Sequence, residues 1–421
     1  MVSELTIQNR SRIRQLSNIK TSYPKAFYWL ILLNVIIDVF AFWSEPGGLT
    51  AIIRVVTLYS VFFYFLLIKK IQFEKNIYIL LFSAYALLQL FTFVDFDYSL
   101  KLTLQIITSL LMFFVGYAMI KNEFDFFYYL KQFFWIYVII IINTIVSNIF
   151  KIGLDDYTKS TDYVVGGLND LWNIYTYSLI MLPLLIFYRV QKKWILYLCS
   201  FLVMIFLLIS LKRIAILGIV FAAFTYLLFL RNKGNILKKL AVFFILVGIT
   251  YPFFSNLFLI RIQVRAEMGR FDNDFYESEG RYLELNYLYE KVLKFADPIE
   301  IIFGLRAFDS RGVVGGDERQ FHVDFTLIAF TIGFFGLFLY LIIYLQLIKD
   351  FFLKYKFFRK NKYLNWRYKH HLLTAWVLIF SSLLTSFGGQ MYHLSFRIII
   401  FMTLGAIYKL LTIEIDRITN K

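Results

Sequence analysis

The stretch LTLQIITSLLMFFVGYAMI occupies residues 102–120 and contains no charged side chain. A helix needs about 20 mainly apolar residues to cross the hydrocarbon core of a bilayer, so this stretch has the length of one membrane span. Similar runs recur along the 421-residue chain, of which 60% is apolar, 20% aromatic and only 17% charged. This composition is typical of integral membrane proteins and far from that of a water-soluble globular domain.

The recurring apolar runs predict an all-α integral membrane protein with about 12 transmembrane helices. One long extracytoplasmic loop, residues 261–321, separates helices one to nine (27–260) from helices ten to twelve (322–412). The first run is not a cleaved signal sequence, because a polar segment precedes it and no small-residue cleavage site follows. The predicted spans are residues 27–43, 49–68, 77–94, 100–120, 133–150, 172–188, 194–210, 214–230, 238–259, 322–348, 372–388 and 394–412.

The distribution of Lys and Arg predicts how the chain is oriented. Every second connection between spans is basic, including the segment KDFFLKYKFFRKNKYLNWRYKHH at residues 349–371, whereas the short connections SEPGG and DFDYS are acidic or neutral. Because cytoplasmic loops carry the excess of Lys and Arg, the N-terminal segment (1–26), the 349–371 loop and the tail (413–421) are predicted to be cytoplasmic. The net charge of +16 is therefore attributed to membrane orientation, and nucleic acid is not an expected partner.

Several cations fall on the outer side, where this rule makes them scarce. Lys212 and Arg213 interrupt the run LISLKRIAILGIV (residues 208–220), Arg54 lies one turn into the second span, and Arg397 lies just inside the last. An unpaired charge at membrane depth costs about 2.5 to 3.5 kcal/mol at worst, so these residues are candidates for binding an anionic ligand. Extension of the side chains to the headgroups is the alternative explanation.

The outer loop contains a predicted amphipathic helix, SEGRYLELNYLYEKVLKFADP, at residues 278–298. Its apolar residues recur at three- and four-residue spacing: Tyr282, Leu285, Leu288, Tyr289, Val292 and Phe295. Gly280 and Arg281 stand at the helix start, where free backbone N–H groups and a guanidinium favour a pyrophosphate. The alternative is that Arg281 only pairs with Glu277 or Glu284.

Two of the four histidines, His322 and His393, are predicted at outer helix ends. Arg319, three residues before His322, would disfavour an imidazolium and keep a neutral base available. His393 shares a helix face with Arg397 at i, i+4 spacing. His322 is therefore the first choice for a general base and His393 the second, although a histidine at a membrane interface can also be a simple anchor.

Outward arginines and one neutral base suit the transfer of a sugar from a polyprenyl pyrophosphate, without a metal or other cofactor. Arginines would hold the departing pyrophosphate, and the histidine would take the proton of the acceptor hydroxyl. The predicted catalytic residues are His322, Arg281 and Arg213. The predicted substrate-binding residues are Arg54, Lys212, Arg319, Arg397 and His393. The single cysteine, Cys199, excludes a disulfide within the chain and a thiolate metal cluster.

Three short segments carry a resemblance to a known family: SLKRIAILGIV, EGRYLELNYLYE, and FGLRAF followed by FHVDFTLIAFTIGFFGLF. Together with the layout of spans, they resemble the Wzy-type polysaccharide polymerases and the related O-antigen ligases. The resemblance places Arg213, Arg281 and His322 on family motif positions. The chain departs from the family where Asp324 replaces a frequent Asn, and where Tyr and Leu replace a common Trp after the Gly-Arg pair.

The resemblance implies a polymerase that joins polyprenyl-pyrophosphate-linked oligosaccharide repeat units at the outer face of the cytoplasmic (inner) membrane. The implied partners are this lipid-linked substrate, the bilayer, and a chain-length regulator and a flippase of the same pathway. Three alternatives stay open: an O-antigen-type ligase with the same chemistry, a lipid-linked oligosaccharide flippase or transporter, and a polyprenyl-phosphate-sugar glycosyltransferase. The flippase is disfavoured because the main polar insertion follows span nine rather than span six.

Overall fold

The computed structural model describes residues 21–41, 49–68, 76–150, 280–294, 296–304, 306–313, 320–360, 366–389, 391 and 394–420, with scattered single positions between 194 and 263. Within these ranges the chain is helical and has no β-strand. Four described helices are long and apolar enough to cross a membrane: α6 (Phe96–Met119), α7 (Glu123–Phe150), α17 (Gly333–Lys360) and α19 (Leu394–Thr419). The described part therefore has the all-helical, membrane-protein character that the sequence predicts; the count of about 12 spans stays a prediction.

Shorter helices occupy four further predicted spans. The first is formed by α2 (Lys25–Tyr28) and α3 (Leu30–Ala41), and the last of the four by α18 (Trp366–Ser386). The other two spans are apolar helices whose last turns are not α-helical. Helix α4 (Leu49–Phe63) continues as the wider π-helix η1 (Tyr64–Ile68), and α5 (Ile77–Leu88) continues as the tighter 3₁₀-helix η3 (Gln89–Thr92). Apart from single positions, the predicted spans between 172 and 259 lie outside the described residues.

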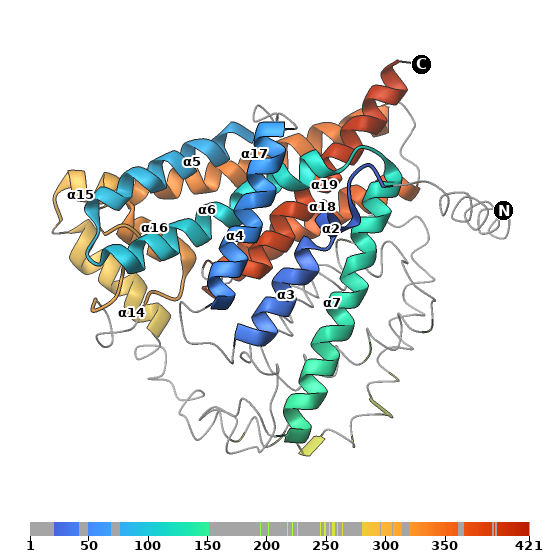
Figure 1. Cartoon of the computed structure of the whole chain (residues 1–421). Helices are drawn as coiled ribbons and strands as arrows, with labels where there is room; N and C mark the ends of the chain where they lie inside the picture. Colours follow the sequence, from blue (N-terminus) through green and yellow to red (C-terminus); the bar gives the residue numbers. More distant parts are fainter. Residues whose placement is uncertain are drawn as a thin grey trace.

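The pair α6 and α19 forms the core of the described bundle (Figure 1). Of their apolar windows, 83% and 78% are buried, against 39% for α17. Gly116 on α6 and Gly405 on α19 allow the two backbones to touch, because an added Cβ at either position would overlap a carbonyl oxygen of the facing helix, that of Met402 or Phe113. Small residues at a helix crossing serve the same purpose in many membrane bundles.

Replacing Gly405 by leucine is expected to destabilise this crossing by at least about 1 to 3 kcal/mol, the usual cost of overpacking a core, because the obstacle is backbone rather than a side chain that could move. The loss appears as a lower melting temperature of the purified protein in detergent. Gly248→Ala is the control, since an added Cβ at Gly248 meets no atom within 4 Å. Equal melting temperatures for Gly405→Leu and the unmodified protein would contradict this packing.

Several helix boundaries differ from the predicted span boundaries. The predicted span 322–348 is two helices, α16 (Asp324–Thr331) and α17, which part at Ile332 and Gly333. The fifth predicted span, expected from residue 133, belongs to α7, which begins ten residues earlier at Glu123. Much of the predicted basic loop 349–371 is helical, because α17 continues to Lys360 and α18 begins at Trp366.

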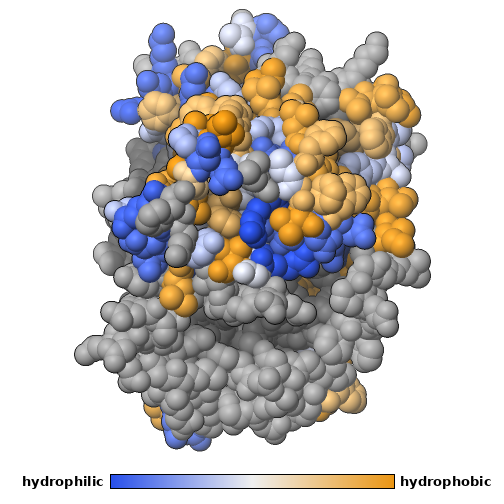
Figure 2. All heavy atoms as spheres, turned by 90° about the vertical axis from the view of Figure 1, so that its left-hand side faces the viewer, coloured by the Kyte–Doolittle hydropathy of each residue, from blue (hydrophilic) through white to orange (hydrophobic). Residues whose placement is uncertain are grey.

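The predicted loop helix is present as α14 (Gly280–Tyr287) followed by the π-helical η4 (Leu288–Leu293). Asp297 then starts a new helix, α15 (Pro298–Phe303), by accepting a hydrogen bond from the backbone N–H of Ile299. Figure 1 shows α14, α15 and α16 gathered at one end of the bundle, on the left of the view. Figure 2 views the molecule from that end, where hydrophilic surface lies across the middle between hydrophobic patches.

Burial on the loop helix follows the predicted apolar residues only in part. Among them Val292 is 9% exposed, but Leu285 and Tyr289 are 54% and 56% exposed. Glu284, by contrast, is fully buried. The face that packs on the bundle therefore carries a carboxylate.

Candidate functional site

Glu284 joins the loop helix α14 to the start of α16. One carboxylate oxygen accepts the backbone N–H of His322 at 2.7 Å, and the other accepts that of Val323 at 3.1 Å and lies 3.5 Å from the Thr326 hydroxyl. Val323 is the N-cap residue of α16 and has no side chain able to cap. Glu284 therefore supplies the acceptor that the N–H groups at this helix start require. The helix dipole also favours a negative charge there.

The imidazole of His322 is held through one of its two nitrogens. Nδ1 lies 3.0 Å from the carbonyl oxygen of Gln320 and 3.9 Å from the nearer carboxylate oxygen of Glu284. Because a carbonyl oxygen can only accept, Nδ1 must carry the proton in this contact. In the neutral ring Nε2 is then the unprotonated nitrogen, and the side chain is 52% exposed. This is the arrangement that a general base needs, with one nitrogen oriented and the other accessible.

The backbone around His322 is fixed from two further sides. The hydroxyl of Ser310 accepts the N–H of Phe321 at 2.9 Å. Gly389, in the turn after α18, has a φ of +76° and lies so close to His322 that an added Cβ would overlap the His322 carbonyl oxygen. Segments from three distant parts of the chain therefore set the position of this histidine.

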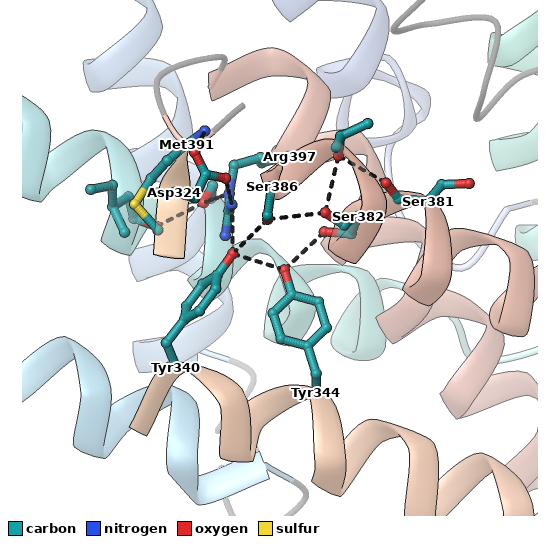
Figure 3. A network of polar contacts seen from close by, with 11 residues as sticks. Asp324, Tyr340, Tyr344, Ser381, Ser382, Ser386, Met391 and Arg397 are labelled. Atoms are coloured by element: carbon teal, nitrogen blue, oxygen red, sulfur yellow. Dashed lines mark hydrogen bonds and ion pairs between the residues drawn. The ribbon is translucent and has the colours of Figure 1, made fainter. Parts of the chain in front are cut away.

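Arg397 lies inside the bundle at the start of α19 rather than at its surface. It is 1% exposed, and its Nη1 lies 3.0 Å from the Tyr340 hydroxyl and 3.8 Å from Oδ2 of Asp324. Its Nε donates to the Ser109 hydroxyl at 3.3 Å. Oδ1 of Asp324 accepts the backbone N–H of Met391 at 2.9 Å, so the buried pair also holds the turn before α19 against α16. Figure 3 shows Arg397 and Asp324 side by side, with Tyr340 beneath them.

A chain of hydroxyl groups continues from Arg397 into the bundle (Figure 3). The Tyr340 hydroxyl lies 3.1 Å from that of Tyr344 and 3.3 Å from that of Ser386, and Tyr344 lies 2.8 Å from Ser382. All four residues are buried, in α17 and α18. Buried polar groups of this kind are stable only when hydrogen-bonded, so the network fixes how α17, α18 and α19 pack.

The structure brings together some predicted site residues and leaves others out of view. Arg281 is the second residue of α14, one turn before Glu284, as the sequence predicted for the helix start. Arg54 is one turn into α4, and its Nη2 lies 3.5 Å from the carbonyl oxygen of Asn34. This contact involves none of the residues around His322. The side chain of Arg281 and the residues Lys212, Arg213, Arg319 and His393 lie outside what the structure describes.

Sequence reasoning missed the roles of Glu284 and Asp324. Glu284 entered only as an alternative partner for Arg281, and Asp324 only as a departure from the family motif. Both are carboxylates with almost no exposure, at 0% and 1%. A signal was available for Asp324, which is the single acidic residue within the apolar run 322–348, where an ionised group requires a partner. Glu284 had no such signal, because the predicted helix 278–298 contains three other acidic residues.

Arg311 fastens the loop after α15 to the start of α6. Its Nη2 donates to Asp95 at 2.9 Å and to Asp309 at 2.8 Å, and its guanidinium carbon lies 3.6 Å from the centre of the Tyr98 ring. Asp95 is also the N-cap of α6 and accepts the N–H of Tyr98. Hydrogen bonds from Arg311 and from the Tyr98 backbone lower the pKa of the Asp95 carboxyl.

The Asp95–Arg311 contact is expected to stabilise the protein at neutral pH and not in acid. The folded pKa of Asp95 lies below the unfolded value of about 3.9, so the contribution is present above that value and is lost as the pH falls through the folded pKa. Asp95→Asn should therefore lower the melting temperature at pH 7, while at pH 3 the two proteins should melt closer together. Asparagine can still cap α6, so the variant isolates the ion pair. A difference that is unchanged between pH 7 and pH 3 would contradict this role.

Among the described residues, no group of three or more His, Cys, Asp and Glu side chains lies close enough to hold a metal ion. The metal-free chemistry expected from the sequence stays a prediction. Comparison of the chain with models of known protein families finds no match, and neither does a search of curated protein sequences.

Proposed function

We propose that the chain is a polysaccharide polymerase of the outer face of the cytoplasmic membrane. It transfers a growing oligosaccharide from polyprenyl pyrophosphate onto the next lipid-linked repeat unit. One observation carries the proposal: Glu284, one turn after Arg281 on α14, accepts the N–H of His322 at 2.7 Å. Two residues that the sequence selects for one reaction, 41 positions apart, thus lie on segments that the Glu284 carboxylate joins.

In the proposed reaction the acceptor sugar hydroxyl attacks the anomeric carbon of the donor. His322 Nε2 takes the proton of that hydroxyl as the new carbon–oxygen bond forms. The bond from the anomeric carbon to the phosphate oxygen breaks with both its electrons, and polyprenyl pyrophosphate leaves as the anion. The start of α14, with its free N–H groups and Arg281, binds this anion as its charge grows. A single displacement of this kind inverts the anomeric centre.

The carboxylate of Glu284 fits this chemistry electrostatically. Once His322 has accepted the proton, its positive charge lies near a buried negative one, 3.9 Å from Nδ1 in the described geometry. The contact lies in a partly buried setting, where such pairs are screened less than at an open surface. The proton then passes to solvent, since the ring is 52% exposed.

A lipid-linked oligosaccharide flippase is the second candidate. It is favoured by the buried Arg397–Asp324 pair, because ionisable groups within a membrane bundle often line transport routes. The Nη2 of Arg397 also has no hydrogen-bond acceptor among the described residues. An O-antigen-type ligase has the same chemistry as the polymerase and differs only in its acceptor.

Deletion of the gene in its native host distinguishes these functions, with the lipid-linked and released saccharides sized on each side of the membrane. Single repeat units that accumulate outside on lipid are the expected result for a polymerase. Full-length polymer left on lipid would indicate a ligase, and units retained on the cytoplasmic face would indicate a flippase. Complementation with the unmodified gene must restore the original pattern.

A further inference from the structure

The carboxylate of Glu284 is fully buried and does not touch the reacting atoms of the sugar-transfer step. It lies on α14, yet it accepts the backbone N–H groups of His322 and Val323 and lies 3.9 Å from the His322 ring. The simplest explanation of a fully buried carboxylate at a helix start is that it caps the helix and does nothing else. The geometry around the His322 imidazole indicates that Glu284 has a second role.

Glu284 acts on the backbone and on the ring of the same residue. Its Oε1 accepts the His322 N–H at 2.7 Å and lies 3.9 Å from the Nδ1 of that histidine. With the Gln320 carbonyl at 3.0 Å, this puts negative or partially negative oxygen on the Nδ1 side. Both oxygens favour the tautomer with the proton on Nδ1, which leaves Nε2 able to accept a proton.

Glu284 also links the base to the pyrophosphate end of the site. Arg281 and Glu284 are three residues apart on α14, so a movement of the helix start is passed directly to the carboxylate. Because Glu284 accepts the N–H groups of His322 and Val323, the two residues before α16, α14 and His322 shift together. The pyrophosphate and the base would therefore keep a fixed separation, which an in-line displacement requires.

We propose that Glu284 is the positioning residue of the general base, and that it sets both the location and the tautomer of His322 from the helix that binds the leaving group. This inference rests on the proposed function. Glu284 does not touch the reacting atoms; it acts through His322. Its loss should therefore reduce turnover rather than substrate binding.

The test uses the full-length protein in lipid nanodiscs, with lipid-linked repeat units extracted from the deletion strain as substrate. Glu284→Gln keeps an oxygen for the His322 N–H but removes the charge and turns an amide donor toward the second N–H. We expect kcat to fall by about 10²-fold, the size associated with a misplaced catalytic group, while KM changes little. Glu284→Asp, which keeps the charge on a shorter side chain, should restore part of kcat.

The control variant is Glu290→Gln. It makes the same change from carboxylate to amide in the same loop helix, but at a residue that is 43% exposed and pairs with Lys294 at 2.8 Å. A kcat close to that of the unmodified protein is expected. An equal loss in Glu290→Gln and Glu284→Gln would show that removing any carboxylate from this helix suffices, and would overturn the positioning role.

A second comparison asks whether Glu284 acts through the imidazole. In a His322→Ala background, Glu284→Gln should change the residual rate by less than about twofold, because residues acting as one unit are not additive. If the fold-losses in kcat of Glu284→Gln and His322→Ala multiply in the double variant, the inference is overturned. If the unmodified protein does not elongate the lipid-linked units at all, the proposed function fails instead, which separates the two outcomes.

The tautomer can be measured without any Glu284 variant, in case Glu284→Gln does not fold. The chain has four histidines, so ¹⁵N-labelled imidazoles give few signals, and the signal lost in His322→Ala identifies the ring. We expect a neutral His322 with its proton on Nδ1. A proton on Nε2 would overturn the inference.

Discussion

Replacing His322 by alanine is expected to lower kcat for elongation of lipid-linked repeat units by about 10² to 10⁴-fold, the usual contribution of a general base. The fall follows from the accessible Nε2, which no other described histidine can replace. His370 and His371 are 8% and 3% exposed within α18, in the segment predicted to be cytoplasmic. The KM for the lipid-linked unit should change little, because His322 is not assigned a role in holding the pyrophosphate.

The loss should not come from unfolding. The His322 side chain is 52% exposed, and the hydrogen bond to Glu284 uses its backbone N–H, which alanine retains. The melting temperature of His322→Ala should therefore stay near that of the unmodified protein. Glu290→Ala is the control in the same loop, since it removes only an exposed ion pair with Lys294. A kcat within about threefold of the unmodified value, far from the expected loss, would exclude His322 as the base.

The predictable part of the fold is the part that depends on local pattern. The apolar run at 100–120 corresponds to α6, and Gly280 with Arg281 begins α14. Both features were predictable because the length and hydropathy of a span, and the residues that start a helix, can be recognised from neighbouring residues. The break between α16 and α17 is not written locally. It depends on Tyr85 of α5, whose hydroxyl donates to the Ile332 carbonyl at 2.8 Å, and on contact between the backbones of Gly333 and the segment before Gly304.

The early start of α7 has a similar explanation. Polar residues made the segment before residue 133 look like a connection. In the structure Asp125 is fully buried and accepts the N–H groups of Ser22 at 2.9 Å and Lys121 at 3.1 Å. The first of these partners is 103 residues away in sequence, so no local pattern could reveal that the carboxylate is satisfied inside the protein.

The candidate site divides in the same way. His322 and Arg281 were selectable because their residue types suit the chemistry and they stand beside helix starts. Glu284 was not, because it is one of four acidic residues in the predicted helix 278–298, and its partner His322 lies 38 residues away in sequence. Residue spacing within one helix does not reveal a contact at that separation.

Removal of Arg397 is expected to have the largest effect on stability. Arg397→Met would leave Asp324 buried at 1% exposure without its cation, and breaking such a pair costs about 3 to 5 kcal/mol. The Tyr340 hydroxyl and Ser109 would lose a donor as well. We expect a melting temperature well below that of the unmodified protein, or loss of the monodisperse species in detergent. Because Asp324 also holds Met391, the turn before α19 should loosen first.

Two comparisons show whether this cost comes from the buried charge. In Asp324→Asn with Arg397→Met both charges are gone, and asparagine keeps an oxygen for the Met391 N–H, so the double variant should be more stable than Arg397→Met alone. Lys294→Met is the surface control: its ion pair with Glu290 is shorter, at 2.8 Å against 3.8 Å, but the two side chains are 44% and 43% exposed. An exposed pair contributes about 0 to 1 kcal/mol, so this variant should melt nearly normally. If Lys294→Met and Arg397→Met lose equal stability, burial does not set the cost, and Arg397 is then better explained as a residue held ready for a ligand.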